Sequence, residues 1–336
     1  MSDHQQALGD FDFRTVAGTF QLRLAELQPD TPLHGMQLQS QYLYGGLRSA
    51  DGTMFVVERK FAGPMSGGLY LMSNEGGELK LLPGSIRSAR GELVRQFTPD
   101  TRHWSDHLMH KVGAEMAPAG EQGLDLTIDD HSMNWSEGEL LNLTGSVTGS
   151  GVQFYSPMRT EPLLYGSQAF WVKGTMLGTP VEGAIFFDHL YFRHGIEWKE
   201  YTWYKDIQVS WNVFGNLFDD GIVEFGHIVR GRRGWNVGVV AEGTEIIGVS
   251  TDVRGDFALD GDDFVAGATY DLGDAQWEFT ADPDGRMSGF NKARWGGYRA
   301  QGGITRRKGD TRTLVNGWTW LECFADRIRG EGLTHS

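Results

Sequence analysis

Asp188 and His189 are the strongest candidates for chemistry, because these two ionisable residues follow directly on an apolar run within the alternating segment 151–198. A charged pair at the inner end of a barrel strand is costly unless it is hydrogen-bonded or used. Glu322 ends a second aromatic run near the C-terminus. Burial raises the pKa of a carboxyl group, so either carboxyl could keep its proton near neutral pH and act as a general acid. We predict Asp188, Glu322 and His189 as catalytic residues, with His189 orienting or relaying the proton.

Adding water to an alkene, or removing it from a tertiary alcohol, passes through a carbocation-like state that aromatic faces stabilise. Arg159 follows the Tyr-Ser-Pro step and could anchor a carboxylate or carbonyl group of a ligand. Tyr204 could add to the aromatic walls. The predicted substrate-binding residues are Tyr44, Tyr155, Arg159, Trp171, Tyr191 and Trp203.

Each of these residues also has a purely structural interpretation. The Asp-His pair could hold backbone groups at a barrel corner, and Glu322 could pair with Arg327 or Arg294. Any single aromatic residue in an alternating strand faces the core half of the time. His194 and His227 are isolated histidines, and we interpret them as residues of a barrel rim.

Three histidines in a Pro- and Gly-rich segment, 99–130, are spaced as on one face of a short helix. His103, His107 and His110 stand at i, i+4 and i+7 and could bind zinc with Asp106 nearby. The alternative is a polar surface helix or loop, which we favour, so no metal site is predicted. The sequence contains no GxGxxG, Walker A or HExxH motif, and no cofactor is predicted either.

The elements that must position these residues are strands. The 336 residues include 47 Gly, 19 Phe, 11 Trp and 10 Tyr, a composition that favours strands joined by tight turns. Asp-Gly pairs begin at residues 51, 220, 260 and 284, each between alternating segments. We predict an all-β protein of antiparallel barrels or sandwiches. The flexible composition of 146–152 predicts an N-terminal barrel over 1–150 and a C-terminal lipocalin-like barrel over 151–336.

The net charge and the lack of recognisable targeting signals limit the classes of partner and the cellular location that we expect. The formal net charge of −14 argues against nucleic acid and anionic membranes as partners. No apolar run reaches the length of a membrane-spanning helix, and the N-terminus lacks the features of a secretory signal. The single cysteine, Cys323, fits a reducing compartment. We therefore predict a cytoplasmic protein, and the sequence leaves its oligomeric state open.

The pattern YSPM…FFDH, from Tyr155 to His189, resembles the two-domain calycin superfamily of carotenoid 1,2-hydratases (hydroxyneurosporene synthases), AttH-like proteins, kievitone hydratases and lipocalin-like pericyclases. The segment 317–322 is similar to the closing strand of those proteins, and 42–52 to their opening hairpin. Two features depart from the pattern. Leu190-Tyr191-Phe192 replaces the usual Trp-Gly, and Gly46 stands where the carotenoid hydratases tend to carry an acid.

This resemblance implies two packed lipocalin-like barrels with a hydrophobic small-molecule ligand. The favoured function is a cofactor-independent enzyme acting on an isoprenoid or polyketide-like compound, as a hydratase or dehydratase (a hydro-lyase) or as an isomerase or cyclase. The alternatives are a carrier that binds such a ligand without chemistry, and an interaction module with a filled barrel.

Overall fold

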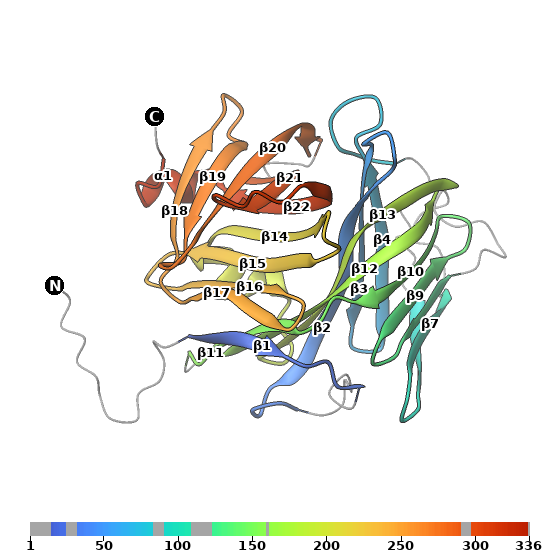
Figure 1. The fold of residues 1–336 in the computed structure, drawn as a ribbon. Helices are drawn as coiled ribbons and strands as arrows, with labels where there is room; N and C mark the ends of the chain where they lie inside the picture. Colours follow the sequence, from blue (N-terminus) through green and yellow to red (C-terminus); the bar gives the residue numbers. More distant parts are fainter. Residues whose placement is uncertain are drawn as a thin grey trace.

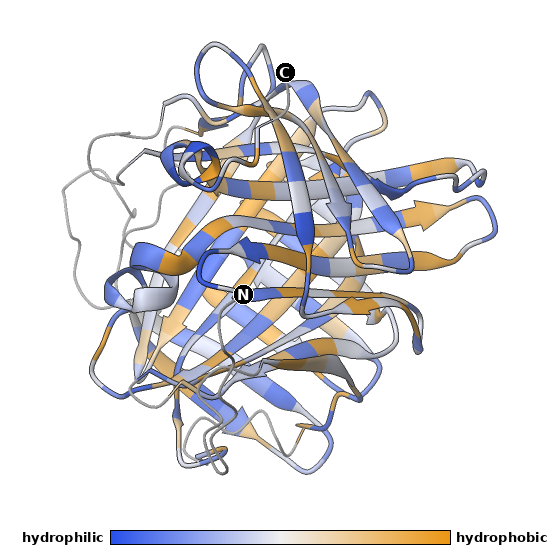
Figure 2. Cartoon of the chain, turned by 90° about the vertical axis from the view of Figure 1, so that its left-hand side faces the viewer, coloured by the Kyte–Doolittle hydropathy of each residue, from blue (hydrophilic) through white to orange (hydrophobic). Residues whose placement is uncertain are grey.

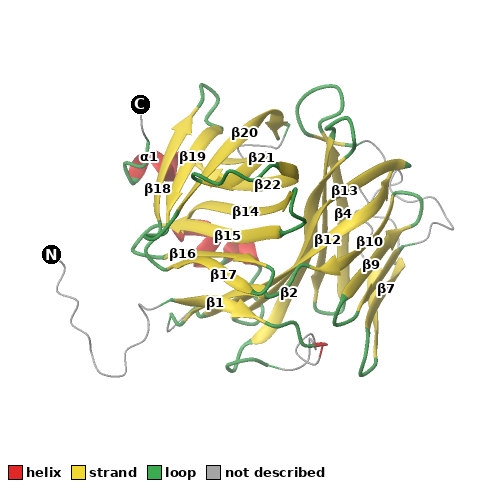
Figure 3. Ribbon diagram, viewed as in Figure 1, coloured by secondary structure: helices red, strands yellow, loops and turns green. Residues whose placement is uncertain are grey.

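The protein is built almost entirely from antiparallel strands, arranged in two large sheets that pack against each other (Figures 1 and 3). Strands account for 65% of it and helices for 6%, which confirms the predicted all-β class. The computed structural model describes residues 15–24, 32–82, 91–108, 123–158, 161–289 and 297–334.

The first sheet has 13 strands, of which ten close into a barrel. Closure follows from the pairing of β12 with both β10 and β13, which joins the two ends of the order β12-β10-β9-β8-β7-β6-β4-β3-β2-β13. Outside this ring, β11 pairs with β12, β1 with β11, and β5 with β4. The strands are β1 (Val16–Phe20), β2 (Gln37–Arg48), β3 (Met54–Ala62), β4 (Met65–Ser73), β5 (Lys80–Leu81), β6 (Gly91–Phe97), β7 (Arg102–Leu108), β8 (Leu124–Ile128), β9 (Ser132–Glu137), β10 (Leu141–Val147), β11 (Gly151–Ser156), β12 (Leu163–Met176) and β13 (Thr179–Phe192).

The second sheet has nine strands in the order β17-β16-β15-β14-β22-β21-β20-β19-β18 and forms a half-barrel. A 3-10 turn (Trp198–Glu200) and a π-helical turn (Trp203–Ile207) lead into it, and helix α1 (Ala325–Gly330) follows it. Its strands are β14 (Gln208–Phe218), β15 (Val223–Gly231), β16 (Asn236–Glu242), β17 (Glu245–Ser250), β18 (Arg254–Leu259), β19 (Val265–Asp271), β20 (Gln276–Arg286), β21 (Tyr298–Arg307) and β22 (Leu314–Phe324).

The chain passes from one sheet to the other between Phe192 and Gln208. The flexible composition of 146–152 predicts a domain division at residue 150. In the structure the strands that follow this position, β11 to β13, pair with β1, β10 and β2, and so extend and close the first sheet.

The wall formed by β12, β13 and β2 is buried on both of its faces. Alternate residues of β13, such as Ile185 and Phe187, fill the inside of the closed barrel, while Ala184 and Phe186 pack against the second sheet. A strand covered on both sides has no solvent face, which explains why 184–192 reads as a nearly continuous apolar run. Strands nearer the surface alternate between apolar and polar residues instead (Figure 2). We call the space between this wall and the second sheet the inter-sheet layer.

Two local predictions from the sequence were wrong. Residues 102–108 form the strand β7 and not a helix, so the spacing of His103 and His107 does not place them on a helical face, and His110 lies outside the described residues. The His103 side chain instead contacts Asp125 of the neighbouring strand β8, with Nε2 to Oδ1 at 3.1 Å. The Asp284-Gly285 pair is not a hairpin turn but lies within β20, where the register with β21 breaks.

Within the part of the chain that the structure describes, no three His, Cys, Asp or Glu side chains gather as a metal site would require. Over the same residues, no helix has the length and apolar character needed to cross a membrane.

Candidate active site

Asp188 lies near the end of β13 on the face that meets the second sheet, and only 5% of its surface is exposed. The register of β12 and β13 places Ser167 directly opposite it. The Ser167 hydroxyl donates a hydrogen bond of 2.6 Å to Oδ1, and the Tyr165 hydroxyl donates one to Oδ2. The antiparallel register of two neighbouring strands therefore positions the carboxyl group and two of its hydroxyl partners.

Burial raises the pKa of Asp188 to about 7, and this effect outweighs the hydrogen bonds from Ser167, Tyr165 and Tyr44, which act in the opposite direction. The charge of Glu58 adds to the increase. A carboxyl group in this environment keeps its proton close to neutral pH and can donate it to a bound molecule.

The second sheet covers Asp188 and its hydroxyl partners with aromatic rings. The Tyr165 ring lies 5.1 Å from Trp211 and 5.5 Å from His227, measured between ring centroids. The Tyr165 hydroxyl also lies 3.4 Å from His227 Nδ1. Burial lowers the pKa of His227 to about 3, so this imidazole is neutral at physiological pH. The structure thus buries His227 in the inter-sheet layer, whereas the sequence interpretation placed it on a rim.

Glu322 and Glu58 bring two more carboxyl groups to the inter-sheet layer. Glu322, on β22, accepts a hydrogen bond of 3.1 Å from Trp320 Nε1, and burial raises its pKa. Glu58, on β3, lies opposite Tyr44 of β2. Burial, followed by the charge of Glu322, raises the pKa of Glu58 to about 7. The layer therefore contains three carboxyl groups that resist ionisation.

Sequence reasoning missed Glu58, although a signal was present. Glu58 occupies the same face of β3 as Met54 and Val56, which pack between the sheets. The criterion that drew attention to Asp188, an ionisable residue that continues the apolar face of a strand, applies equally to Glu58.

His189 lies on the other face of β13 from Asp188, because consecutive residues of a strand point to opposite sides of the sheet. Its ring contacts Phe187 inside the closed barrel, at 4.5 Å between centroids. The structure therefore does not bring the predicted Asp-His pair together, and His189 is not placed to relay a proton to Asp188.

The same alternation decides which predicted aromatic residues reach the site. Tyr44, one of the predicted substrate-binding residues, lies beside Asp188. Tyr155 instead stacks on His34, at 5.3 Å, and its neighbour Phe154 takes the place on the inner face, stacked 4.9 Å from the Tyr165 ring.

The remaining predicted binding residues lie away from Asp188. Trp171 faces the inter-sheet layer, but its indole donates to Glu182 Oε1 at 2.7 Å. Trp203 packs on a neighbouring tryptophan and donates to the backbone carbonyl of Glu161 at 3.0 Å. Tyr191 shares the face of His189, and Arg159 lies outside the described residues.

The structural alternative for Glu322, an ion pair with Arg327, is not what the structure shows. The Arg327 guanidinium donates to the backbone carbonyl groups of Tyr204, Lys205 and Gln208. Arg294, the other partner suggested for Glu322, lies outside the described residues. Burial, followed by the charge of Glu322, raises the pKa of the Tyr204 hydroxyl.

Gly46 is required by close packing at the position where the carotenoid hydratases tend to carry an acid. A Cβ atom at this position would lie 1.8 Å from Trp318 Nε1, inside the indole ring that packs against β2. The tryptophan therefore occupies the volume that a side chain at residue 46 would need.

Two surface pockets lie at other places in the fold. One, of about 340 Å³, opens at one end of the closed barrel, and the other, of about 640 Å³, lies where Arg48 and Glu182 meet Asn316 of the second sheet. Neither is lined by the carboxyl groups of the inter-sheet layer.

Three solved structures similar to this chain are an AttH-like protein of Nitrosomonas europaea, the kievitone hydratase of Nectria haematococca and CghA. The TM-scores are 0.49, 0.41 and 0.46, and the sequence identities are 14%, 8% and 10%. The matches cover 88%, 89% and 92% of this chain and 98%, 91% and 98% of the other chains. No family model matches the chain, and no curated protein matches it.

Proposed function

We propose that this protein is a cofactor-independent acid catalyst that acts on an apolar small molecule bound in the inter-sheet layer. The observation that carries the proposal is the buried Asp188 carboxyl, which keeps its proton near neutral pH and is held by the hydroxyl groups of Ser167 and Tyr165. An acid of this kind among aromatic rings suits hydration, dehydration, isomerisation or cyclisation.

In the proposed reaction Asp188 transfers its proton to an alkene carbon, or to a hydroxyl group that then leaves as water. The carboxylate that remains accepts hydrogen bonds from hydroxyl groups already in place, so little reorganisation is needed. The Asp188 carboxylate then recovers a proton, either from the carbon next to the cation or from the water that attacks it, so that each turnover returns Asp188 to its protonated form.

The surroundings of Asp188 support a cationic intermediate. The centroid of the Phe186 ring lies 5.8 Å from that of Tyr44 and 6.1 Å from that of Trp318. Three rings therefore lie close to one another on the Asp188 side of the wall. Aromatic faces attract cations more strongly when water is excluded. An isoprenoid or polyketide-like substrate is apolar enough to pack against these rings and can form such a cation when it is protonated.

The same aromatic surface also supports a carrier function, in which the protein binds the ligand without converting it. Tyr42, Tyr44 and Trp211 pack against the buried cluster of the inter-sheet layer and yet keep part of their surface accessible. Such residues can bind an apolar ligand whether or not Asp188 reacts with it.

Untargeted mass spectrometry of metabolite extracts separates the two functions. The wild-type protein and the variants Asp188→Asn and Asp256→Asn are incubated with the same extract, and bound and free compounds are compared. Asp256 is exposed on β18 and controls for the loss of a carboxyl group. We expect the wild type and Asp256→Asn to convert a compound that Asp188→Asn binds without converting. Equal conversion by Asp188→Asn would contradict the proposed acid, and binding without conversion by all three would establish a carrier.

A further inference from the structure

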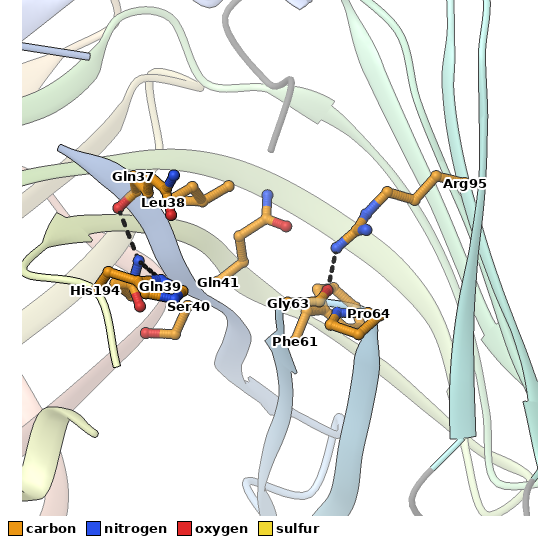
Figure 4. Close-up of a pocket in the computed structure, with 10 residues that line it drawn as sticks. All are labelled: Gln37, Leu38, Gln39, Ser40, Gln41, Phe61, Gly63, Pro64, Arg95 and His194. Atoms are coloured by element: carbon orange, nitrogen blue, oxygen red, sulfur yellow. Dashed lines mark hydrogen bonds between the residues drawn. The ribbon is translucent and has the colours of Figure 1, made fainter. Parts of the chain in front are cut away.

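The closed barrel has a pocket of its own, separate from the inter-sheet layer. The pocket, of about 340 Å³, lies at the end of the barrel where β2 begins, and Figure 4 shows Gln41, Phe61 and Arg95 around it. Its volume falls within the range of small-molecule sites. The barrel wall lies between this pocket and Asp188, because Gln41 and Asp188 belong to opposite faces of β2 and β13.

Gln41 is a buried polar residue that has an unused donor at this pocket. Only 2% of its surface is exposed, and its Nε2 has no hydrogen-bond partner among the described residues. Figure 4 shows its side chain extending from β2 into the space toward Arg95. A buried amide without a hydrogen-bond partner destabilises the folded protein. A ligand group that accepts a hydrogen bond would remove that destabilisation.

His189 provides the complementary acceptor beside Gln41. The two residues are directly paired across β2 and β13, so their side chains are neighbours on the inner face of the barrel. His189 is 5% exposed and hydrogen-bonds to the backbone of Phe187, whereas its Nε2 has no partner among the described residues. Burial lowers the pKa of His189 to about 4, so the ring is neutral and Nε2 can accept a hydrogen bond.

Aromatic rings continue from the pocket into the barrel. Phe61 lines the pocket and lies 6.2 Å from Phe187, which in turn lies 5.4 Å from Trp104 and 4.5 Å from His189. All three contacts are edge-on. Gln41 and Phe61 line the pocket, and His189 and Phe187 lie next to them on the inner face of the barrel. A donor, an acceptor and aromatic rings therefore lie together beyond the pocket, a combination that is the complement of a ring that carries a hydroxyl group.

We propose that the closed barrel contains a second ligand site, for a small phenolic molecule whose hydroxyl group bridges Gln41 Nε2 and His189 Nε2 and whose ring lies against Phe61 and Phe187. The hydroxyl accepts a hydrogen bond from the amide and donates one to the imidazole. Because His189 lies on the other face of β13 from Asp188, it takes no part in the proposed acid catalysis, but in this second site it binds the ligand. The proposal for the second site does not depend on the proposed catalysis.

NMR titration of the 15N-labelled protein with p-cresol and with p-xylene tests this site. The two probes have the same shape and differ in the hydroxyl group. The side-chain amide resonance of Gln41 is assigned by its disappearance in Gln41→Leu. We expect p-cresol to shift this resonance and to bind about five- to tenfold more tightly than p-xylene, as one to two hydrogen bonds to buried groups imply.

A variant separates recognition of the hydroxyl from binding to the aromatic rings. In His189→Phe, p-cresol should lose most of its advantage over p-xylene, while Asp256→Asn should keep it. Equal affinities for both probes in the wild type would overturn the proposal, as would p-cresol shifts confined to the indole resonances of the inter-sheet layer. The affinities of p-cresol and p-xylene are compared in the wild-type protein, so this part of the test does not depend on the folding of any variant.

Discussion

Replacing Asp188 by Asn should make the stability of the protein less dependent on pH. The carboxyl has a pKa of about 7 in the folded protein, above the ordinary value of 3.8 that it regains on unfolding. Between these two values the folded state binds a proton that the unfolded state has lost. The stabilisation from this group is therefore fully present below about pH 4 and is lost as the pH rises through 7.

The size of the effect follows from the two pKa values. Between pH 5 and pH 8 the wild-type protein should lose roughly 2–3 kcal/mol of unfolding free energy through Asp188 alone. Glu58 and Glu224 have pKa values raised in the same direction, also chiefly by burial, and they contribute to both proteins. The difference between wild type and Asp188→Asn isolates the Asp188 contribution.

Urea denaturation at pH 5 and pH 8 measures this difference. At pH 5, Asp188→Asn should be about 1 kcal/mol less stable than the wild type, because a hydroxyl partner must reorient toward the amide. At pH 8 it should be no less stable than the wild type, because Asn cannot ionise and the wild type has lost the contribution of Asp188. Asp256→Asn, at an exposed carboxyl, should follow the wild-type pH dependence. An identical loss of stability in wild type and Asp188→Asn between the two pH values would refute the raised pKa, and with it the proposed acid.

Two further predictions test the packing of the inter-sheet layer. Gly46→Ala should lower the unfolding free energy by about 2 kcal/mol or more in urea denaturation, because its Cβ would overlap the Trp318 indole; unchanged stability would mean that the ring moves freely. Phe154→Leu should slow conversion of the compound identified by mass spectrometry about tenfold, whereas Tyr155→Leu should leave the rate within twofold of wild type. The reverse order of the two rates would show that the face assignment of β11 is wrong.

Much of the fold could be predicted from the sequence. Aromatic, alternating segments separated by Asp-Gly pairs indicate antiparallel strands, and the pairs at Asp51 and Asp220 do form turns, with Gly52 and Gly221 at positive φ. The Asp284 pair fails because a break in register within β20 accommodates the same two residues without a turn. Local composition therefore identifies the strands better than it identifies where each strand ends.

Of the candidate site, the sequence identified Asp188, Glu322 and Tyr44, all of which face the inter-sheet layer. It did not identify Glu58, and it joined Asp188 to His189 because the two are adjacent in the chain. In a strand buried on both faces, adjacency separates two side chains rather than joining them. The hydroxyl groups that hold Asp188 come from a neighbouring strand, through the register of β12 with β13.

The sequence by itself determined the class of the protein and the presence of ionisable residues within apolar strands, because composition and alternation are local properties of the chain. Only the tertiary structure decided which face each residue joins and which strands close the barrel. Closure by β12 and β13 brings residues from 163–192 against β2 and beneath the second sheet. This long-range pairing, which no local pattern specifies, divides Asp188 and His189 between two separate environments.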